Sequence, residues 1–495
     1  MENNKSAIII GAGIGGISTA IFLARKGYKV EVFEKNSYPG GRCGQIVRDG
    51  HRFDIGATIL MMPSIYRSVF ESLELNFDDC FDLKPLPTVY KVYFKNGEHL
   101  AFSSNRESMK PQLEAIEAGS YPRFLKYVNS GYAFFKLSME QLLGRNFRNL
   151  SEFITFKNVA LLIKLKTYLS HKKYVARFFD SSKLQKAFTF QNIYVGQSPL
   201  EAPALFAMLP AAELTEGALF PIGGMYSITE KLVSTAKNLG VAFHFGKPVS
   251  KIVIVGDRVD GVEFADGSRA SAGLVVANAD LPYVYRELLP DKSAARRLEK
   301  KKYACSAMVF HWGLNKVYPQ LGHHSVFLSD DFKGSLDMIF KNHSLSDKPS
   351  FYIHSPVRTD PSAAPPGKDS LSVIIPMGHL DPQVSQNWNH LIKSTRLAVI
   401  ERLREIGIDD IEENIRLEIC YPPTTWESIF NVSKGSVFGS LKHSIMQMGY
   451  FRPHNRHNRY RNLYFTGGST HPGNGVPLVL LSAKLTSERI LSDTE

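Results

Sequence analysis

The sequence predicts an α/β protein in which a Rossmann-like nucleotide-binding domain is assembled from both ends of the chain. Three observations support this. Residues 7–34 read as an apolar strand, a glycine-rich turn, an apolar helix and a second strand, which is the pattern of a βαβ unit. Residues 462–491 again read as strand, glycine-rich turn and helix. The chain has 495 residues, more than one hydrophobic core normally serves, so we expect two or three domains.

The first turn carries the spacing of a dinucleotide-binding motif. Gly11 permits a tight turn, Gly13 lets the backbone approach a pyrophosphate, and Gly16 lets the helix pack closely on the strand. The helix N-terminus then offers free amide donors to the phosphates. Glu34, at the end of the second strand, is placed to hold a ribose hydroxyl. The alternative is an ordinary glycine-rich turn without a ligand.

The segment after this acid indicates which dinucleotide binds. Gly40, Gly41 and Arg42 form a turn that resembles the second fingerprint of two-domain FAD flavoproteins, and we also assign Lys35 to the cofactor site. Adjacent glycines let the backbone lie against the cofactor, and Arg42 supplies a fixed charge. We therefore predict FAD as the cofactor and expect residues 53–57 to pass close to the flavin. A surface turn with a solvated arginine is the alternative.

The C-terminal turn is predicted to complete the same site. Gly468 and Gly475 make room for a ligand, and Pro477 suits the first turn of a helix. The amides around Gly475 and Val476 are then placed to face the pyrophosphate or the flavin.

Longer segments resemble a known family. Residues 450–484 resemble the C-terminal signature of bacterial phytoene desaturase-type carotenoid desaturases, and residues 188–199, 220–232 and 275–280 are also similar. The resemblance implies an FAD-dependent, membrane-associated enzyme that introduces carbon-carbon double bonds into long polyenes by hydride transfer to flavin. It also implies that Val249 lies where backbone groups bind adenine.

The resemblance leaves the subtype open. The run from Pro477 to Leu481 is more similar to 1′-hydroxycarotenoid 3,4-desaturases, although plain packing explains these leucines equally well. The alternative is a phytoene or diapophytoene desaturase, which acts early in carotenoid biosynthesis. Alternatives of other classes are an amine oxidase, a non-redox carotenoid isomerase, and a prenyl-lipid carrier on the same fold.

Few residues suggest a catalytic base. Asp54, His454 and His471 are weak candidates, because turn capping or backbone hydrogen bonding is at least as good an explanation for each. Oxygen or a membrane quinone is the expected electron acceptor, since the chain has no second nucleotide motif for NAD(P)H. The four cysteines are widely separated and form no ligand pattern, so we expect no metal site.

The charge balance suggests a partner surface. Formal net charge is +12, from 59 basic and 47 acidic residues, and no nucleic-acid motif accompanies it. Residues 153–179 combine apolar side chains with lysines and predict a basic amphipathic surface that binds anionic lipid. Ordinary helices with solvated lysines are the alternative. With no signal peptide or long apolar run recognised, we expect a cytoplasmic protein that binds membranes peripherally.

These segments suggest a discontinuous domain layout. We assign residues 1–80, 215–300 and 450–495 to the FAD-binding domain. Residues 81–214 and 301–449 are assigned to a mixed α+β region that binds the substrate and presents helices to the membrane. Strands near 306–314 and 369–380 are expected to form a sheet that roofs a long tunnel.

Overall fold

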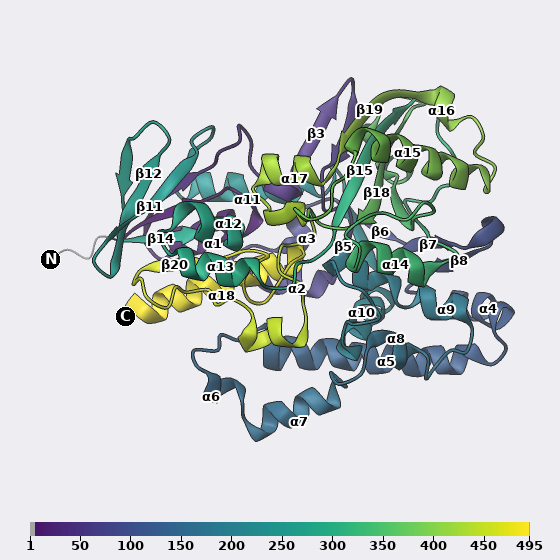
Figure 1. Ribbon diagram of the computed structural model, residues 1–495, viewed down its shortest axis with the longest axis horizontal. Helices are drawn as coiled ribbons and strands as arrows, with labels where there is room; N and C mark the ends of the chain where they lie inside the picture. Colours follow the sequence, from purple (N-terminus) through teal and green to yellow (C-terminus); the bar gives the residue numbers. More distant parts are fainter. Residues whose placement is uncertain (1–4, 495) are drawn as a thin grey trace.

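The computed structural model describes residues 5–494, and at its centre lies a parallel five-stranded sheet with the order β10-β2-β1-β14-β20. The sheet begins with β1 (Ser6–Ile10), which α1 (Ile14–Arg25) connects to β2 (Lys29–Phe33). The other strands come from distant parts of the chain: β10 (Ala242–His244), β14 (Leu274–Ala277) and β20 (Leu463–Phe465). The predicted βαβ unit is therefore present, and a strand from the C-terminal region completes its sheet (Figure 1).

Both faces of this sheet are covered, which explains why its central strands are apolar throughout. On one face α1 packs against α11 (Tyr226–Asn238) and α18 (Val476–Thr494). On the other lies an antiparallel meander of β11 (Val249–Val255), β12 (Arg258–Phe264) and β13 (Arg269–Ser271). Alternate residues of β1 serve the two layers, since Ile9 belongs to the helical core and Ile8 to the meander core.

A second, seven-stranded mixed sheet lies beside the first, with the order β19-β15-β18-β17-β16-β7-β8. The long pair β15 (Ser306–Leu314) and β18 (Asp369–Met377) corresponds to the two strands predicted near 306–314 and 369–380. The remaining strands are β7 (Tyr90–Tyr93), β8 (His99–Phe102), β16 (His324–Phe327), β17 (Phe351–His354) and β19 (Ile415–Tyr421). Two smaller sheets complete the strand inventory of the described residues. One pairs β3 (Gln45–Arg48) with β4 (His51–Asp54), and the other has the order β5 (Leu60–Met61), β9 (Ala218–Pro221) and β6 (Leu83–Leu86).

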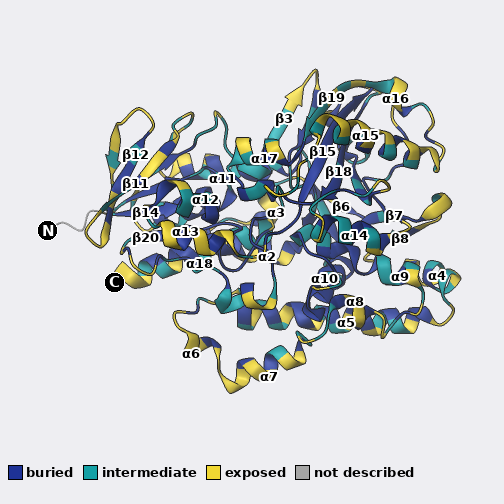
Figure 2. Cartoon of the chain, viewed as in Figure 1, coloured by how far each residue is buried: buried dark blue, intermediate teal, exposed yellow. Residues whose placement is uncertain are grey.

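Helices extend below the two sheets and around their edges. In chain order they include α2 (Pro63–Ser72), α3 (Phe77–Cys80), α4 (Arg106–Ile116), α5 (Ser120–Ser138), α6 (Leu150–Phe153), α7 (Phe156–Lys164), α8 (His171–Val175), α9 (Ser182–Ala187) and α10 (Met208–Glu216). Further along lie α12 (Leu281–Tyr283), α13 (Lys292–Glu299), α14 (Phe332–Phe340), α15 (Trp388–Arg404), α16 (Ile411–Asn414) and α17 (Pro423–Phe430). The helices α6 and α7 project furthest from the sheets, and they are coloured largely as exposed in Figure 2. Within residues 5–494, we find no helix with both the length and the apolar character needed to cross a bilayer.

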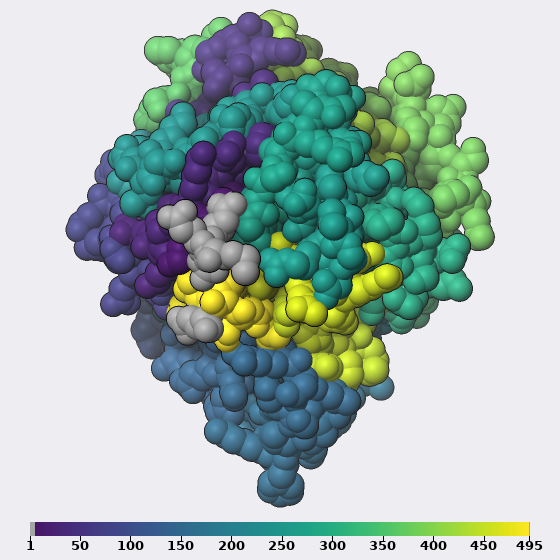
Figure 3. All heavy atoms as spheres, turned by 90° about the vertical axis from the view of Figure 1, so that its left-hand side faces the viewer, coloured from purple at the N-terminus to yellow at the C-terminus, as the bar shows by residue number. Residues whose placement is uncertain are grey.

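The architecture confirms the predicted fold class, a Rossmann-like domain joined to a mixed α+β region. Figure 3 shows how segments from the start, middle and end of the chain meet on one face, with residues of the 101–200 region below them. The proposed domain boundaries stay a prediction. All five strands of the parallel sheet lie within the ranges assigned to the FAD-binding domain.

Candidate functional site

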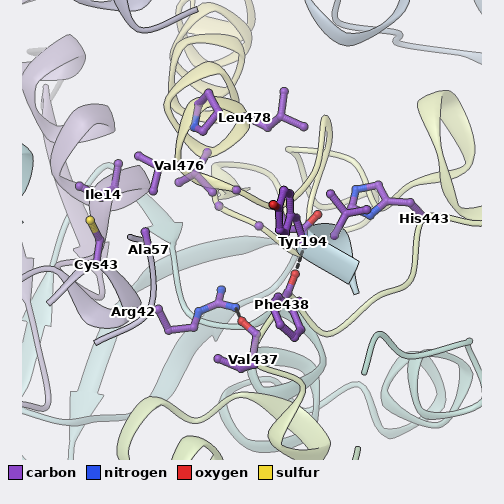
Figure 4. A pocket seen from close by; sticks show the side chains of 18 of the residues that line it. Ile14, Arg42, Cys43, Ala57, Tyr194, Val437, Phe438, His443, Val476 and Leu478 are labelled. Atoms are coloured by element: carbon purple, nitrogen blue, oxygen red, sulfur yellow. Dashed lines mark hydrogen bonds between the residues drawn. The ribbon is translucent and has the colours of Figure 1, made fainter. Parts of the chain in front are cut away.

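One large cavity, with a volume of about 560 Å³, runs between the parallel sheet and the seven-stranded sheet. Its walls come from both glycine-rich ends of the chain and from the central region (Figure 4). Most of the predicted cofactor residues line it: Gly11, Gly13, Glu34, Lys35, Gly40, Gly41, Arg42, Val249, Gly468, Gly475 and Val476. The structure thus gathers segments that are more than 400 residues apart in the sequence.

The first glycine turn is crowded, which explains its composition. Gly11 has a φ of +96°, in the region that favours glycine, and Gly13 begins α1 without a capping side chain. A Cβ atom on Gly13 would lie 2.9 Å from Asn278 Nδ2. A Cβ on Gly16 would lie 2.2 Å from the carbonyl oxygen of Gly11, so this glycine serves helix-to-strand packing and does not line the cavity.

The second glycine turn is bonded directly to the first. The Gly40 amide donates to the carbonyl of Ala12 at 2.8 Å, and Gly40 pairs with Gly13 in a short parallel bridge. Gly40 has a φ of +102°. Arg42 points along the cavity wall and donates from Nη1 to the carbonyl of Val437 at 2.7 Å (Figure 4). Burial lowers the pKa of Arg42 from its usual value, and the carboxylate of Asp280 partly offsets this.

Glu34 lies at the carboxyl end of β2, with its carboxylate held by the backbone. The amides of Ala12 and Asn36 donate to it at 2.8 and 2.9 Å. Burial raises its pKa, while these two amides and Lys35 act in the opposite direction. Lys35 directs its ammonium away from the glycine turn, to the carbonyl of Ser428 at 2.8 Å. It therefore connects the β2 end to the α17 region.

Four residues that line the cavity were not predicted from the sequence. Asn278 follows the buried strand β14 and is close to several glycines of both ends, donating to the Gly11 carbonyl at 3.1 Å. Its position at the carboxyl end of a parallel strand is the signal that could have found it. Asp280, His443 and Asn474 also line the cavity. Neither ring nitrogen of His443 has a hydrogen-bond partner among the described residues, and no sequence motif marks this histidine.

The three weak candidates for a catalytic base lie outside the cavity lining. Asp54 accepts from the amides of Met225 and Tyr226 at the start of α11, and burial raises its pKa to about 6. His471 Nε2 is 2.9 Å from the carbonyl oxygen of Arg145, and burial lowers its pKa to about 4. His454 lines a separate small polar pocket that also contains His471. The contacts of Asp54 and His471 support a structural role for these two residues.

Away from the glycine turns, the cavity becomes apolar. Helix α5 and the segment after it contribute Phe135, Met139, Leu142 and Leu143, while Phe153 and Leu162 come from α6 and α7. The central region adds aromatic and aliphatic side chains: Phe190, Ile193, Tyr194, Phe206, Leu209, Val326, Leu328 and Tyr352. The cavity therefore has a glycine-rich end and a long apolar end that reaches the projecting helices.

Comparison with known proteins now places the chain. Residues 14–491 match the model of a protein family, flavin containing amine oxidoreductase. The chain belongs to the flavin containing amine oxidoreductase family.

Relatives of known activity narrow the family to one class of enzyme. A zeta-carotene-forming phytoene desaturase from Myxococcus xanthus is 38% identical, covering 99% of this chain and 94% of its own. A 4,4′-diapophytoene desaturase from Staphylococcus haemolyticus is 33% identical, covering 98% and 99%. A crystal structure of an oxidoreductase from Methanosarcina mazei shares the fold, with a TM-score of 0.62, 18% identity, and coverage of 98% of this chain and 100% of that one. The resemblance to phytoene desaturase-type carotenoid desaturases is confirmed.

The family match and the desaturase relatives together make this protein an FAD-dependent oxidoreductase that acts on CH–CH bonds, and the cavity fits FAD. Its glycine turns leave a cradle that Cβ atoms would fill, the N-terminus of α1 faces it, and the carboxylate of Glu34 lies at its edge. Which group of FAD each residue contacts stays a prediction. The comparisons do not support the preference for a 3,4-desaturase, because the relatives just described are phytoene and diapophytoene desaturases.

Proposed function

We propose that this protein is a phytoene or diapophytoene desaturase, which introduces double bonds into a linear polyene precursor. Relatives with these names match almost the full chain at 33–38% identity. This assignment replaces the 1′-hydroxycarotenoid 3,4-desaturase preferred from the run of leucines at the start of α18. Leu480 and Leu481 are buried members of the main core, so packing accounts for them.

The observation that carries the proposal is the continuity of the cavity. The same cavity that Gly11, Gly13 and Arg42 line extends to Leu142 and Leu162 near the projecting helices. The polar groups of a polar substrate would find no hydrogen-bond partners in this apolar end, which costs free energy. A hydrocarbon chain, by contrast, gains free energy from burial there. The shape suits a long, extended, apolar substrate with one segment held beside the cofactor.

The chemistry divides between cofactor and protein. Bound FAD supplies a two-electron acceptor for the hydride equivalent that leaves one carbon, while the neighbouring carbon releases a proton. The apolar walls position the substrate chain and exclude bulk water from the reacting carbons. Because Asp54, His454 and His471 lie outside the lining, we assign none of them as the base and expect a water molecule to accept the proton.

We further propose that helices α6 and α7 contact the membrane. Phe156 is 92% exposed and Ile163 is 60% exposed, and both lie on one face of α7. Leu162, on the same helix, lines the cavity. Exposed apolar side chains with lysines around them favour insertion into the headgroup region of an anionic bilayer. The substrate would then enter from lipid without crossing water, and oxygen or a membrane quinone would reoxidise the cofactor.

Pigment analysis tests the substrate assignment. FAD-loaded protein is incubated in liposomes with phytoene, diapophytoene or a 1′-hydroxylated carotenoid, and the products are separated by chromatography. We expect stepwise loss of hydrogen pairs from phytoene or diapophytoene. Desaturation of the hydroxylated carotenoid alone would overturn the proposal in favour of a 3,4-desaturase. An amine substrate with peroxide detection serves as a further arm, and turnover of the amine alone would make the protein an amine oxidase.

A further inference from the structure

A cluster of three histidines lies behind the wall of the cavity. His324 on β16 and His354 on β17 are register partners across the antiparallel pair, and His323 precedes β16. All three are buried, with exposures of 8%, 1% and 1% for His323, His324 and His354. Each can bring one ring nitrogen to within 4.8 Å of the other two, the one such group of three or more potential ligands found among residues 5–494.

Hydrogen bonds outside the cluster orient two of the rings. Thr359 Oγ1 lies 2.7 Å from Nδ1 of His323, and the Tyr352 hydroxyl lies 2.8 Å from Nδ1 of His324. The Tyr352 hydroxyl can in turn donate a hydrogen bond to Thr58 Oγ1, which is 2.9 Å away. Both Nδ1 atoms can therefore be donors, which leaves Nε2 as the unprotonated nitrogen of His323 and of His324. Without a metal ion, Nε2 of His323 can accept a hydrogen bond from Nε2 of His354, whereas Nε2 of His324 has no partner among the described residues. Histidines that bind metals are usually held through the other ring nitrogen in this way.

The inner nitrogens are close and incompletely paired. Nε2 of His354 and Nε2 of His323 are 3.2 Å apart, close to the ~3.3 Å that separates two ligands of one tetrahedral zinc ion. Nε2 of His324 and Nδ1 of His354 have no hydrogen-bond partner among the described residues. Buried polar atoms without partners are costly, so an additional group at this place would satisfy them.

The histidines are in the protonation state that metal binding needs. Burial lowers the pKa of His323 to about 3, and burial together with the neighbouring rings lowers the pKa values of His324 and His354 well below the usual value for histidine. All three rings are neutral at pH 7. A metal ion therefore displaces no side-chain proton from them at that pH.

We propose that His323, His324 and His354 form a binding site for one transition-metal ion, with Zn²⁺ as the best match. Three imidazoles and an open fourth position suit Zn²⁺, whereas Mg²⁺ and Ca²⁺ prefer oxygen ligands. Arg358 and Asp360 act on the pKa of His323 in opposite directions, and each is neutralised in an ion pair, Arg358 with Asp369 and Asp360 with Arg52. The ion's charge is thus held by neutral ligands, as in zinc sites made of three histidines.

The site has a direct connection to the cavity. Tyr352 and Thr58 both line it, and Tyr352 reaches His324 from there. A bound ion would fix the His324 ring and, through it, the position of Tyr352 at the wall. No sequence motif marks this site, because His354 is 30 residues from His324 and only the pairing of β16 with β17 brings them together.

Metal analysis on tag-free, FAD-loaded protein tests the proposal. The protein is treated with a chelator, incubated with Zn²⁺, desalted and analysed for metal. We expect one zinc per chain, and with Co²⁺ as the probe a visible absorption band typical of tetrahedral coordination. Chains that retain no zinc and give no such band would overturn the proposal and leave a hydrogen-bonded cluster of neutral histidines.

Variants separate this site from adventitious binding. His324→Gln and His354→Gln should each abolish retained zinc, and Tyr352→Phe should weaken binding by about 10- to 100-fold through loss of the outer hydrogen bond. The control is His379→Gln, because His379 is also buried and stacks on His343 at 4.1 Å outside the cluster. It should retain zinc fully. Equal retention in the His324 and His379 variants would contradict the assignment, and thermal unfolding reports whether each variant is folded.

Discussion

Asn278 shows how a single residue can organise the cofactor end. Its side chain donates to the Gly11 carbonyl, and its amide atoms would be the nearest neighbours of a Cβ on Gly13, Gly15 or Gly467. The glycines were predictable because their spacing is local. Asn278 was not, since its role depends on where β14 enters the sheet between β1 and β20.

Glu34 gives a prediction at this scale. Glu34→Ala removes the carboxylate proposed to bind the ribose. A hydrogen bond to a charged group contributes about 1.5–3 kcal/mol, so FAD affinity should fall roughly 10- to 100-fold. Flavin content after desalting and a fluorescence titration of the apoprotein measure this.

The control is Glu31→Ala, on the same strand, whose carboxylate contacts His244 outside the cavity. It should retain FAD normally. Unchanged affinity in the Glu34 variant would contradict the ribose assignment.

Glu213 predicts an unusual dependence of stability on pH. The Tyr90 hydroxyl donates to its carboxylate at 2.5 Å, yet burial raises the pKa of Glu213 from 4.5 to about 8. The folded state then holds a proton that the unfolded state releases above pH 4.5. This contribution to the free energy of unfolding is present below pH 4.5 and is lost as pH rises toward 8, at roughly 1.4 kcal/mol per pH unit.

Glu213→Gln mimics the protonated form and removes this dependence. Urea unfolding at pH 5 and pH 8 should show the variant gaining stability relative to the native protein as pH rises, while other titrating groups cancel in the comparison. A difference between the two proteins that stays constant over this range would show that Glu213 is ionised at pH 5 or below.

At the scale of elements, the segment 153–179 was predicted as helical and basic, and the structure forms α7 and α8 within it. The sequence could not tell which apolar residues face solvent. The apolar residues of α7 fall into two groups. Phe156 and Ile163 are exposed, whereas Leu161 is buried and Leu162 lines the cavity. That division depends on how α7 packs against the rest of the folded chain, which its own sequence does not specify.

The membrane proposal predicts a charge effect on this element. Reversing its lysines to Glu should weaken binding to anionic liposomes by more than about tenfold at low salt, because each lysine near an anionic surface contributes about 1 kcal/mol. The positions are Lys164, Lys166, Lys172 and Lys173. Co-sedimentation with phosphatidylglycerol vesicles measures the change.

Four exposed lysines elsewhere provide the matched control: Lys237, Lys251, Lys300 and Lys393. Their reversal changes the net charge equally and should reduce binding much less. Equal losses in both variants would mean that overall charge governs binding, and no loss in either would leave α7 and α8 as a solvated surface.

At the scale of the whole molecule, the two ends of the chain form one site. The motifs at residues 11–16, 40–42 and 467–476 each indicated a nucleotide site. Their resemblance to the motifs of FAD flavoproteins predicted that all three belong to one site. The apolar end was harder to predict, because its residues belong to several helices and strands and have no common spacing. A hydrophobic residue in the sequence looks the same whether it fills a core or lines a cavity.

Anaerobic reduction of the bound flavin tests the central claim most directly. Phytoene in liposomes is mixed with FAD-loaded protein without oxygen or quinone, and flavin absorbance and pigment are followed together, with diapophytoene in a parallel sample. We expect loss of the oxidised flavin band in proportion to the hydrogen pairs removed from one of these precursors. Flavin that stays oxidised in both samples, whether or not the carotenoid isomerises, would contradict it.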